Sequence, residues 1–375
     1  MLRRLTFTAL FIVTLVVLLG APWQPAIAQT HPSARAPYAL PVYRLPDSST
    51  MIVGVLTAQE EIVLEARNAD GSWILGHSAD GSTRGWLHAT RLNFENGTQA
   101  LSLPVSQEEM FHASAQSLVS DYPHISLNSL PVLPTRFGRA AEIAATGRAL
   151  GLDPRAISKV GDCLTESAHF LTPFAGEAIN LGGHTSLSEV VAQFKASFGE
   201  TSLAAYDGLV TSAVLDPTFA NPGACQPGET PLRCEYRVRK PAVAIIMFGA
   251  QDLLFTPAHE FNRNLRQIVH ETIAAGVVPL LSTFPGHNGQ WERAIQYNQI
   301  VVQVALDYDV PLLNLFRALE PLPNHGLTSD GRHLTPPITH PADLSAANVQ
   351  QGYPLRNLLT LQALDAVWRE IAISG

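Results

Sequence analysis

Three residues whose side chains could carry out acyl transfer stand in two short stretches of this sequence. The stretch SKVGDCLTES (158–167) follows an apolar run and presents Cys163 in a polar turn. Far along the chain, TSDGRHLTPP (328–337) places Asp330 three residues before His333. An aspartate at this spacing can hold the Nδ1 proton of the histidine and leave Nε2 as a base for a nucleophilic thiol. We therefore expect a catalytic group of Cys163, Asp330 and His333, in which the histidine favours the thiolate at neutral pH.

Other assignments of these residues stay open at this stage. Cys163 could be a buried core residue or half of a disulfide, and Thr165 or Ser167 could supply a hydroxyl nucleophile from the same turn. Asp330 and His333 could form an ordinary pair on an exposed loop. A position behind a predicted sheet favours the catalytic role.

The remaining groups that acyl transfer needs are donors to a developing oxyanion, and small or amide residues at two other predicted strand ends suit that task. Gly208 ends the stretch TSLAAYDG (201–208), and Gln251 follows the apolar run in KPAVAIIMFGAQD (240–252). A backbone N–H beside a glycine and a carboxamide N–H₂ can both approach an oxyanion. The histidines show no metal-ligand spacing, and no glycine-rich phosphate motif follows a strand, so we expect no metal and no cofactor.

The elements that must position these groups alternate regularly from residue 155 onward. Predicted strands cover 155–162, 201–208, 240–250, 277–285 and 310–316, and predicted helices cover 186–198, 259–276 and 292–308. Strands that alternate with helices predict an α/β fold with a doubly wound parallel sheet. Such sheets bind ligands at the carboxyl ends of their strands, where the candidate residues stand.

The N-terminal half of the chain has a different pattern. Residues 38–94 form short alternating runs separated by NADGS and ADGST turns, which predicts a small all-β barrel. Residues 95–154 are interpreted as a helical connector with helices at 106–122 and 139–152. Trp73 and Trp86 could line a ligand groove of the barrel or be core aromatics.

These blocks carry two resemblances to known families. Residues 155–375 resemble the SGNH (GDSL-like) hydrolases, because VGDCLTES puts Cys163 at the position of the family's serine and SDGRH supplies Asp330 and His333. YDGLVTS puts Gly208 at the oxyanion glycine, and FGAQDL puts Gln251 where the family has asparagine. The resemblance implies a flavodoxin-like, three-layer α/β/α fold and hydrolysis of acyl or acetyl esters, often on carbohydrates or lipids.

Residues 38–94 resemble the bacterial Src homology 3-like domains, through VYRLP, GVLTAQEEIVL, GSW and GWLHATRL. That resemblance implies a module that binds cell-wall peptides or glycans, or that packs on a partner domain. The changes of serine to cysteine and of asparagine to glutamine leave two functions open. One is an esterase or acyltransferase with a thiol nucleophile, and the other is an inactive module that holds a glycan or acyl ligand.

The first residues and the cysteine count indicate the compartment. Residues 1–28 combine Arg3-Arg4, an apolar run at 5–21 and a PAIA end, which is typical of a secretory signal peptide, and 29–37 then form a linker. An uncleaved membrane anchor is the alternative. Cys225 and Cys234 flank a Pro/Gly-rich loop and are expected to form a disulfide, the alternative being two free thiols.

Composition excludes some classes of partner. The chain of 375 residues is 46% hydrophobic and 15% charged, which is typical of globular proteins. Its formal net charge is −8, and removal of the two arginines in 1–28 gives −8 − 2 = −10. This balance disfavours nucleic acid as a partner and a polybasic membrane-binding patch. The resemblance to the SGNH hydrolases implies a small-molecule or carbohydrate ester as the substrate.

Overall fold

The structure is a computed structural model that describes residues 31–43, 46, 52–106 and 125–373. The chain divides into two compact units, one up to Val105 and one from Ser106, and each is described by itself. The expected signal peptide and nearly all of the expected helix at 106–122 lie outside the described residues. Within the described ranges, no helix is long and apolar enough to cross a membrane.

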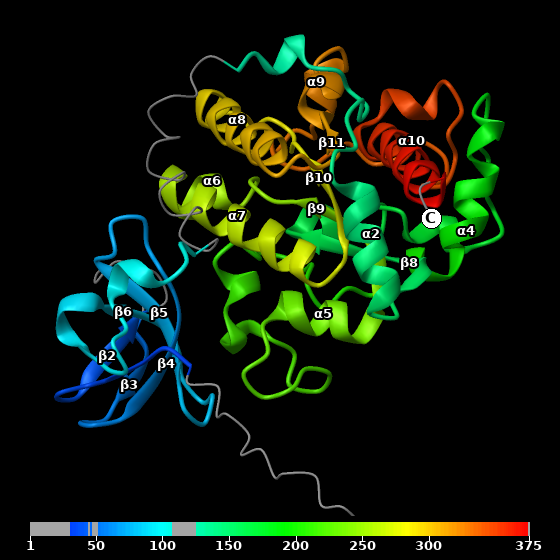
Figure 1. Cartoon of the computed structure of the whole chain (residues 1–375). Helices are drawn as coiled ribbons and strands as arrows, with labels where there is room; N and C mark the ends of the chain where they lie inside the picture. The colour runs from blue at the N-terminus through cyan, green and yellow to red at the C-terminus, as the bar shows by residue number, and fades with distance from the viewer. Residues whose placement is uncertain (1–30, 44–45, 47–51, 107–124, 374–375) are drawn as a thin grey trace, which may run out of the picture. The chain divides into compact units, whose positions relative to one another are not determined.

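The N-terminal unit is an antiparallel sheet that curls around its own apolar core (Figure 1). The strand order is β3-β2-β6-β5-β4-β1-β7. The strands are β1 (Ser33–Arg35), β2 (Leu40–Tyr43), β3 (Ile52–Leu56), β4 (Glu61–Arg67), β5 (Trp73–Ser78), β6 (Arg84–His88) and β7 (Asn93–Phe94). Alternation of apolar and polar side chains, as in the buried–half-buried pattern of β4, places one face of each strand toward the core.

The expected linker at 29–37 is wrong in part, because it contains β1. Ala34 and Ala36 are fully buried, and β1 pairs with both β4 and β7. Small side chains hid this strand from a reading that looks for large apolar residues. The sheet therefore begins before residue 38.

The C-terminal unit is built on a parallel sheet in the order β11-β10-β9-β8. Its strands are β8 (Asp153–Gly161), β9 (Pro241–Met247), β10 (Val278–Ser282) and β11 (Leu312–Leu313). All residues of β10 are buried, as continuous apolar runs in a sheet covered on both faces should be. The expected strand at 201–208 is wrong, since only a single parallel bridge joins Ala205 to Gly161 beside β8.

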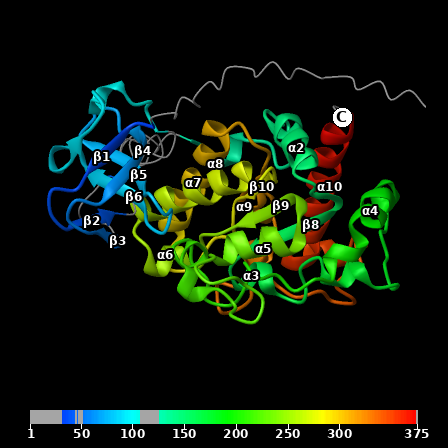
Figure 2. The same ribbon diagram turned by 60° about the horizontal axis from the view of Figure 1, so that its bottom comes forward.

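Helices cover both faces of this sheet, which gives the three-layer α/β/α fold that we expected. Helices α2, α4 and α10 pack together on one face, and α5, α7 and α8 lie on the other. In Figure 2, α7 and α10 lie on opposite sides of β9 and β10. The helices are α2 (Ala140–Ala149), α3 (Cys163–Glu166), α4 (Ser188–Phe198), α5 (Pro231–Arg239), α6 (Asp252–Phe255), α7 (Ala258–Ala274), α8 (Trp291–Asp307), α9 (Leu315–Leu319) and α10 (Gly352–Ile373).

The expected helical connector at 95–154 is wrong for α2, which belongs to the α/β unit. Ala140, Ile143 and Ala144 are buried in the same core as the sheet. The sequence reading also missed α5 and the long helix α10. Because α10 buries side chains on most of its circumference, it lacks the one-sided apolar pattern by which helices are usually recognised.

Candidate active site

The structure brings Cys163 and His333 together although 170 residues separate them in the sequence. Cys163 is the first residue of α3, one residue beyond the end of β8, and its Sγ lies 3.7 Å from Nε2 of His333. Nδ1 of His333 lies 2.7 Å from Oδ2 of Asp330. Since a carboxylate only accepts, Nδ1 carries the proton and Nε2 is free to accept the S–H proton. The three residues thus have the geometry of a nucleophile, a base and an orienting acid.

The loop around Asp330 holds this carboxylate firmly. Oδ1 accepts hydrogen bonds from the Thr328 hydroxyl and from the backbone N–H groups of Arg332 and His333. Slight burial acts to raise the pKa of Asp330, but these hydrogen bonds outweigh it and lower the pKa well below its ordinary value. Asp330 is therefore ionised at neutral pH and can keep His333 in one tautomer.

The thiol of Cys163 is protonated at neutral pH, so the expectation that the thiolate is favoured is wrong for the resting protein. Burial raises the pKa of Cys163 to about 12, and the negative charges of Asp162 and Asp207 add to this effect. The positive charge of Arg332 acts in the opposite direction. The arrangement favours proton transfer to His333 during attack, as with a serine hydroxyl, over a preformed ion pair.

Gly208 follows the segment that runs beside the end of β8. Gly161 donates its N–H to the carbonyl of Ala204 and bridges to Ala205 in parallel register, so residues 206–208 continue toward the same edge as Cys163. Gly208 is exposed and has φ +78°, which a side chain would strain. The charge of Asp207 reaches the thiol, which places this turn near the nucleophile.

Gln251 lies at the carboxyl end of β9 and caps the short helix α6. The residue is 7% exposed, and its Oε1 accepts a hydrogen bond from Arg332 at 3.2 Å. Gly249, two residues earlier, has φ +129° and faces the Phe284 ring so closely that a Cβ would lie 2.1 Å from it. The glycine therefore lets the chain turn over Phe284 and brings Gln251 to the site.

Two buried carboxyl groups, one in the nucleophile turn and one close enough to affect its charge, were not singled out by the sequence reading. Asp162 accepts a hydrogen bond from the N–H of Leu164, and Asp252 accepts from the N–H and hydroxyl of Thr211. Burial raises the pKa of Asp162 to about 7 and that of Asp252 to about 6. The remaining oxygen of each carboxyl group has no hydrogen-bond partner among the described residues. Burial thus makes each of these carboxyl groups easier to protonate than an exposed aspartate.

The start of α10 holds the nucleophile turn from behind, which the sequence reading also missed. Arg356 is 1% exposed; it donates to the Leu164 carbonyl and to the Thr165 hydroxyl and lies over the Phe170 ring. Asn357 accepts from the N–H of Leu171. No local motif in the sequence marks these residues, because only the packing of α10 brings them to the turn.

The structure disfavours the two alternative nucleophiles. Thr165 is fully buried, with its hydroxyl held by Arg356. The Ser167 hydroxyl accepts from the backbone N–H of His169 and interacts with Tyr353. Within the described part of the chain, His333 forms no hydrogen bond with the hydroxyl of Thr165 or of Ser167. The geometry therefore supports Cys163 as the nucleophile.

In the N-terminal unit, the two tryptophans separate. Trp86 is 1% exposed and forms a small core with Ala66 and Leu75, so the expectation that it binds a ligand is wrong. Trp73 is half-buried, and its ring contacts Tyr43 and His88. Only Trp73 of the pair can offer part of its ring to a ligand.

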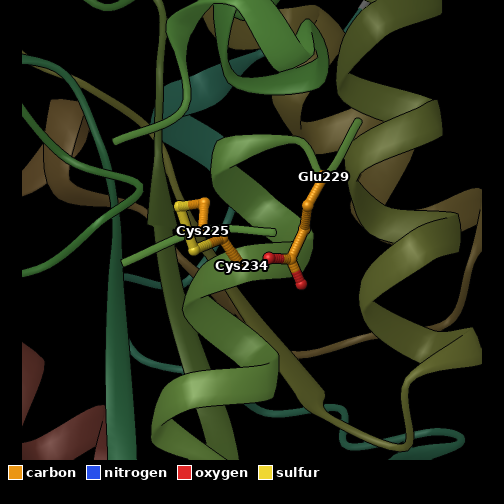
Figure 3. A group of neighbouring side chains, drawn as sticks. All are labelled: Cys225, Glu229 and Cys234. Carbon is orange, nitrogen blue, oxygen red and sulfur yellow. A yellow bond between two sulfur atoms is a disulfide. The ribbon is translucent and has the colours of Figure 1, made fainter. Parts of the chain in front are cut away.

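The expected disulfide is present between Cys225 and Cys234, and Cys163 is free. Glu229 lies beside the two sulfur atoms, as Figure 3 shows. Sulfur atoms in a disulfide are not thiolate ligands, and Glu229 is paired with Arg237. This group therefore holds the loop before α5 together and offers no metal site.

A cavity of about 230 Å³ lies away from this chemistry. It is bordered by α2, the end of α10 and the first residues of β8 and β9, with Arg148 and Trp368 among its lining residues. Because those are the amino ends of the strands, the cavity lies at the edge opposite to Cys163. None of the candidate catalytic residues lines it.

The part of the chain that carries the site is similar to a known family. Residues 161–343 match the model of the GDSL-like lipase/acylhydrolase family. The match begins at Gly161 beside the nucleophile turn and includes Gly208, Gln251, Asp330 and His333. It supports a GDSL-like lipase/acylhydrolase domain in this part of the chain. A comparison with curated proteins gives no significant match.

Solved structures of similar fold include three bacterial proteins. A lipase/acylhydrolase from Enterococcus faecalis is 22% identical, with 56% of this chain and 95% of that chain covered and a TM-score of 0.36. A GDSL-like lipase from Bacteroides thetaiotaomicron is 15% identical, with 60% and 97% covered and a TM-score of 0.37. A catalytic mutant of an acetylxylan esterase from Geobacillus stearothermophilus is 16% identical, with 56% and 93% covered and a TM-score of 0.36. At such low identities and TM-scores, these likenesses assign no activity to this chain.

Proposed function

We propose that the GDSL-like acylhydrolase domain makes this protein an exported esterase with Cys163 as its nucleophile. The substrates are acyl or acetyl esters, including esters on carbohydrate or cell-wall material. One observation carries the proposal: Sγ of Cys163 lies 3.7 Å from Nε2 of a histidine whose other nitrogen is held by Asp330. A thiol that served only in packing would not need this pair beside it.

The proposed reaction uses these groups in two half-reactions. His333 takes the S–H proton at Nε2 while the sulfur attacks the ester carbonyl carbon, and the carbonyl oxygen becomes an oxyanion. The oxyanion accepts hydrogen bonds from Gln251 and from the backbone N–H groups of Gly208 and Cys163. The ester C–O bond then breaks, and His333 gives the proton to the leaving alkoxide, which leaves a thioester on Cys163.

The second half of the reaction reverses these roles. Water, or the hydroxyl of an acceptor, loses a proton to Nε2 of His333 and attacks the thioester carbonyl. The C–S bond breaks, the acid or the new ester departs, and the proton returns to sulfur. Asp330, which its hydrogen bonds keep ionised, stabilises the imidazolium in both halves.

An inactive module that holds a glycan or acyl ligand is the second candidate, and one observation favours it. The pKa of Cys163 is raised to about 12, which opposes formation of a free thiolate. An enzyme could still react through this thiol, because His333 can remove the S–H proton during the attack. A binding module needs no thiolate at all, so the raised pKa is compatible with it. Activity measurements decide between the two.

The test is hydrolysis of a small aryl acetate by the purified chain. We expect turnover in the wild type, none in Cys163→Ala or His333→Ala, and turnover in Cys163→Ser, because a hydroxyl can use the same base. His259→Ala is the matched control, because the side chain of His259 is 60% exposed and its ion pair is with Glu260, which is not one of the three candidate catalytic residues. Full activity in Cys163→Ala would move the nucleophile elsewhere. Inactivity of both the wild type and Cys163→Ser would favour the binding module.

Export and cell-wall docking complete the proposal. The basic start and apolar run of residues 1–28 support cleavage as a signal peptide, and the disulfide suits an oxidising compartment. Trp73, with Tyr43 and His88 beside it, is the docking residue that we propose for the N-terminal unit. Co-sedimentation of the full chain with purified cell walls tests this role. Trp73→Ala should weaken binding of the chain to the cell walls without disturbing the core around Trp86.

A further inference from the structure

We propose that Arg332 is a positioning residue that turns the carboxamide of Gln251 so that its N–H₂ group faces the developing oxyanion. This inference rests on the proposed esterase function and adds a residue to it. Arg332 stands between Asp330 and His333 in the loop at 328–337. One short segment would therefore supply the base and also position the oxyanion donor.

The direction of the carboxamide follows from donor and acceptor chemistry. One guanidinium nitrogen of Arg332 lies 3.2 Å from Oε1 of Gln251. A guanidinium group has only donors, so the atom that faces it must be the carbonyl oxygen and not the nitrogen. The amide nitrogen of Gln251 must then point away from Arg332.

The amide nitrogen of Gln251 is also left without a competing acceptor. In the described ranges its Oε1 bonds to Arg332, whereas its nitrogen neither bonds to a protein group nor counts among the buried atoms without a partner. The nitrogen is therefore open to a ligand although the residue as a whole is 7% exposed. A donor held on one side and open on the other suits an oxyanion hole.

The contact explains how a glutamine can act at a site where one methylene more than asparagine has to be accommodated. A longer side chain has one more rotatable bond, and holding it in a single rotamer costs conformational entropy. The hydrogen bond from Arg332 selects one rotamer before the substrate arrives, so the donor is preorganised. The positive charge also reaches Cys163 and opposes the charges of Asp162 and Asp207.

Within the described residues, Arg332 has little else to hold. The Gln251 contact is the one hydrogen bond of its side chain there, and the guanidinium forms no ion pair with a carboxylate in those ranges. Most of the other arginines of this unit that bond to side chains bond to carboxylates, as Arg237 does with Glu229. The half-buried side chain of Arg332 donates its hydrogen bond to an amide oxygen near the nucleophile. A role in positioning Gln251 explains this contact better than a role in the stability of the fold.

A double-mutant cycle on aryl acetate hydrolysis tests the proposal. Gln251→Ala removes a donor and should lower kcat by roughly 10²–10³-fold. Arg332→Met should lower kcat by about 10- to 100-fold with little change in KM, and the double variant should be no slower than Gln251→Ala within about threefold. Gln251→Glu keeps an oxygen for Arg332 but loses the N–H₂ group, so it should be as slow as Gln251→Ala. Multiplicative losses in the double variant would overturn the proposal.

A second measurement works without activity and so separates this proposal from the esterase proposal. The Gln251 side-chain amide protons, assigned in ¹⁵N-labelled full chain by their loss in Gln251→Glu, should shift or broaden in Arg332→Met. They should be unchanged in the matched control Arg136→Met, whose side chain is 69% exposed and pairs with Asp309 at the surface. Amide signals that do not move in Arg332→Met would refute the positioning role, whether or not the chain hydrolyses esters.

Discussion

The protonation state of Cys163 leads to a quantitative prediction about its reaction with iodoacetamide. Burial, aided by Asp162 and Asp207, raises the pKa of this thiol from an ordinary 9.0 to about 12. At pH 8 an ordinary thiol is about one-tenth thiolate, whereas a thiol of pKa about 12 is roughly 10⁻⁴ thiolate. Since the thiolate is the species that reacts, protonation alone slows alkylation about 10³-fold.

The greater nucleophilicity of a more basic thiolate partly offsets this decrease in the alkylation rate. With a Brønsted coefficient of about 0.4–0.5, three pKa units raise the reactivity of the thiolate roughly 15- to 30-fold. The net expectation is alkylation about 30- to 60-fold slower than that of a free thiol, with a rate that rises steadily between pH 7 and pH 10. Partial burial of the sulfur makes this a lower limit on the slowing.

Mass spectrometry of the intact, non-reduced chain measures the rate cleanly. Cys225 and Cys234 are joined in the disulfide, so Cys163 is the single thiol that can take up one carbamidomethyl group. Cys163→Ala is the control and should take up none, and glutathione is the reference thiol. Alkylation faster than that of glutathione, with a plateau near pH 6–7, would show a thiolate–imidazolium pair and refute this account of the site.

Three further predictions concern the acid, the buried carboxyl groups and the clamp from α10. Asp330→Asn should lower kcat by up to about 10⁴-fold without unfolding the chain, because the amide no longer holds the proton on Nδ1 of His333; steady-state kinetics on an aryl acetate measure it, and a loss under tenfold would contradict the role. Asp252 has its folded pKa raised to about 6 from 3.8, so its stabilisation is complete below about pH 3.8 and is lost as pH rises through 6. Asp252→Asn should therefore gain up to about 3 kcal/mol of unfolding free energy relative to wild type between pH 4 and pH 7 in urea titrations, and parallel pH curves would count against it. Arg356→Lys should cost about 2–3 kcal/mol of stability, because one ammonium group cannot bond the Leu164 carbonyl and the Thr165 hydroxyl and also stack on Phe170; an unchanged urea midpoint would show that the clamp is dispensable.

The short sequence blocks pointed to the three candidate residues that the fold brings together, because each block is a local pattern at a strand end. Cys163 follows a buried run, and Asp330 precedes His333 at a spacing that lets a loop bond one side chain to the other. Parallel strands end at one edge of a sheet, so residues far apart in the chain could be expected to meet there. The Cys225–Cys234 pairing was equally local, since the two residues flank a short loop.

Other features depend on contacts between distant segments, which no single stretch of sequence encodes. Arg356 reaches the nucleophile turn only because α10 packs against it, 191 residues away in the chain from Thr165. The raised pKa of Cys163 comes from burial and from charges that the fold brings close to it. The resting side chain is therefore a thiol and not the thiolate that the sequence suggested. Trp86 was indistinguishable from Trp73 by residue type, and only packing showed that it is buried.

What the sequence indicated by itself was therefore most of the alternation of strands and helices, the edge of the sheet that carries the candidate site, and the candidates for nucleophile, base and acid. These follow from hydrophobic periodicity and from side-chain chemistry at short spacing. The tertiary structure decided which side chains are buried, which charges face the thiol, and that Arg332 holds the oxygen of Gln251. Burial and electrostatic interactions act through space, so they take their values only when the folded chain sets the distances.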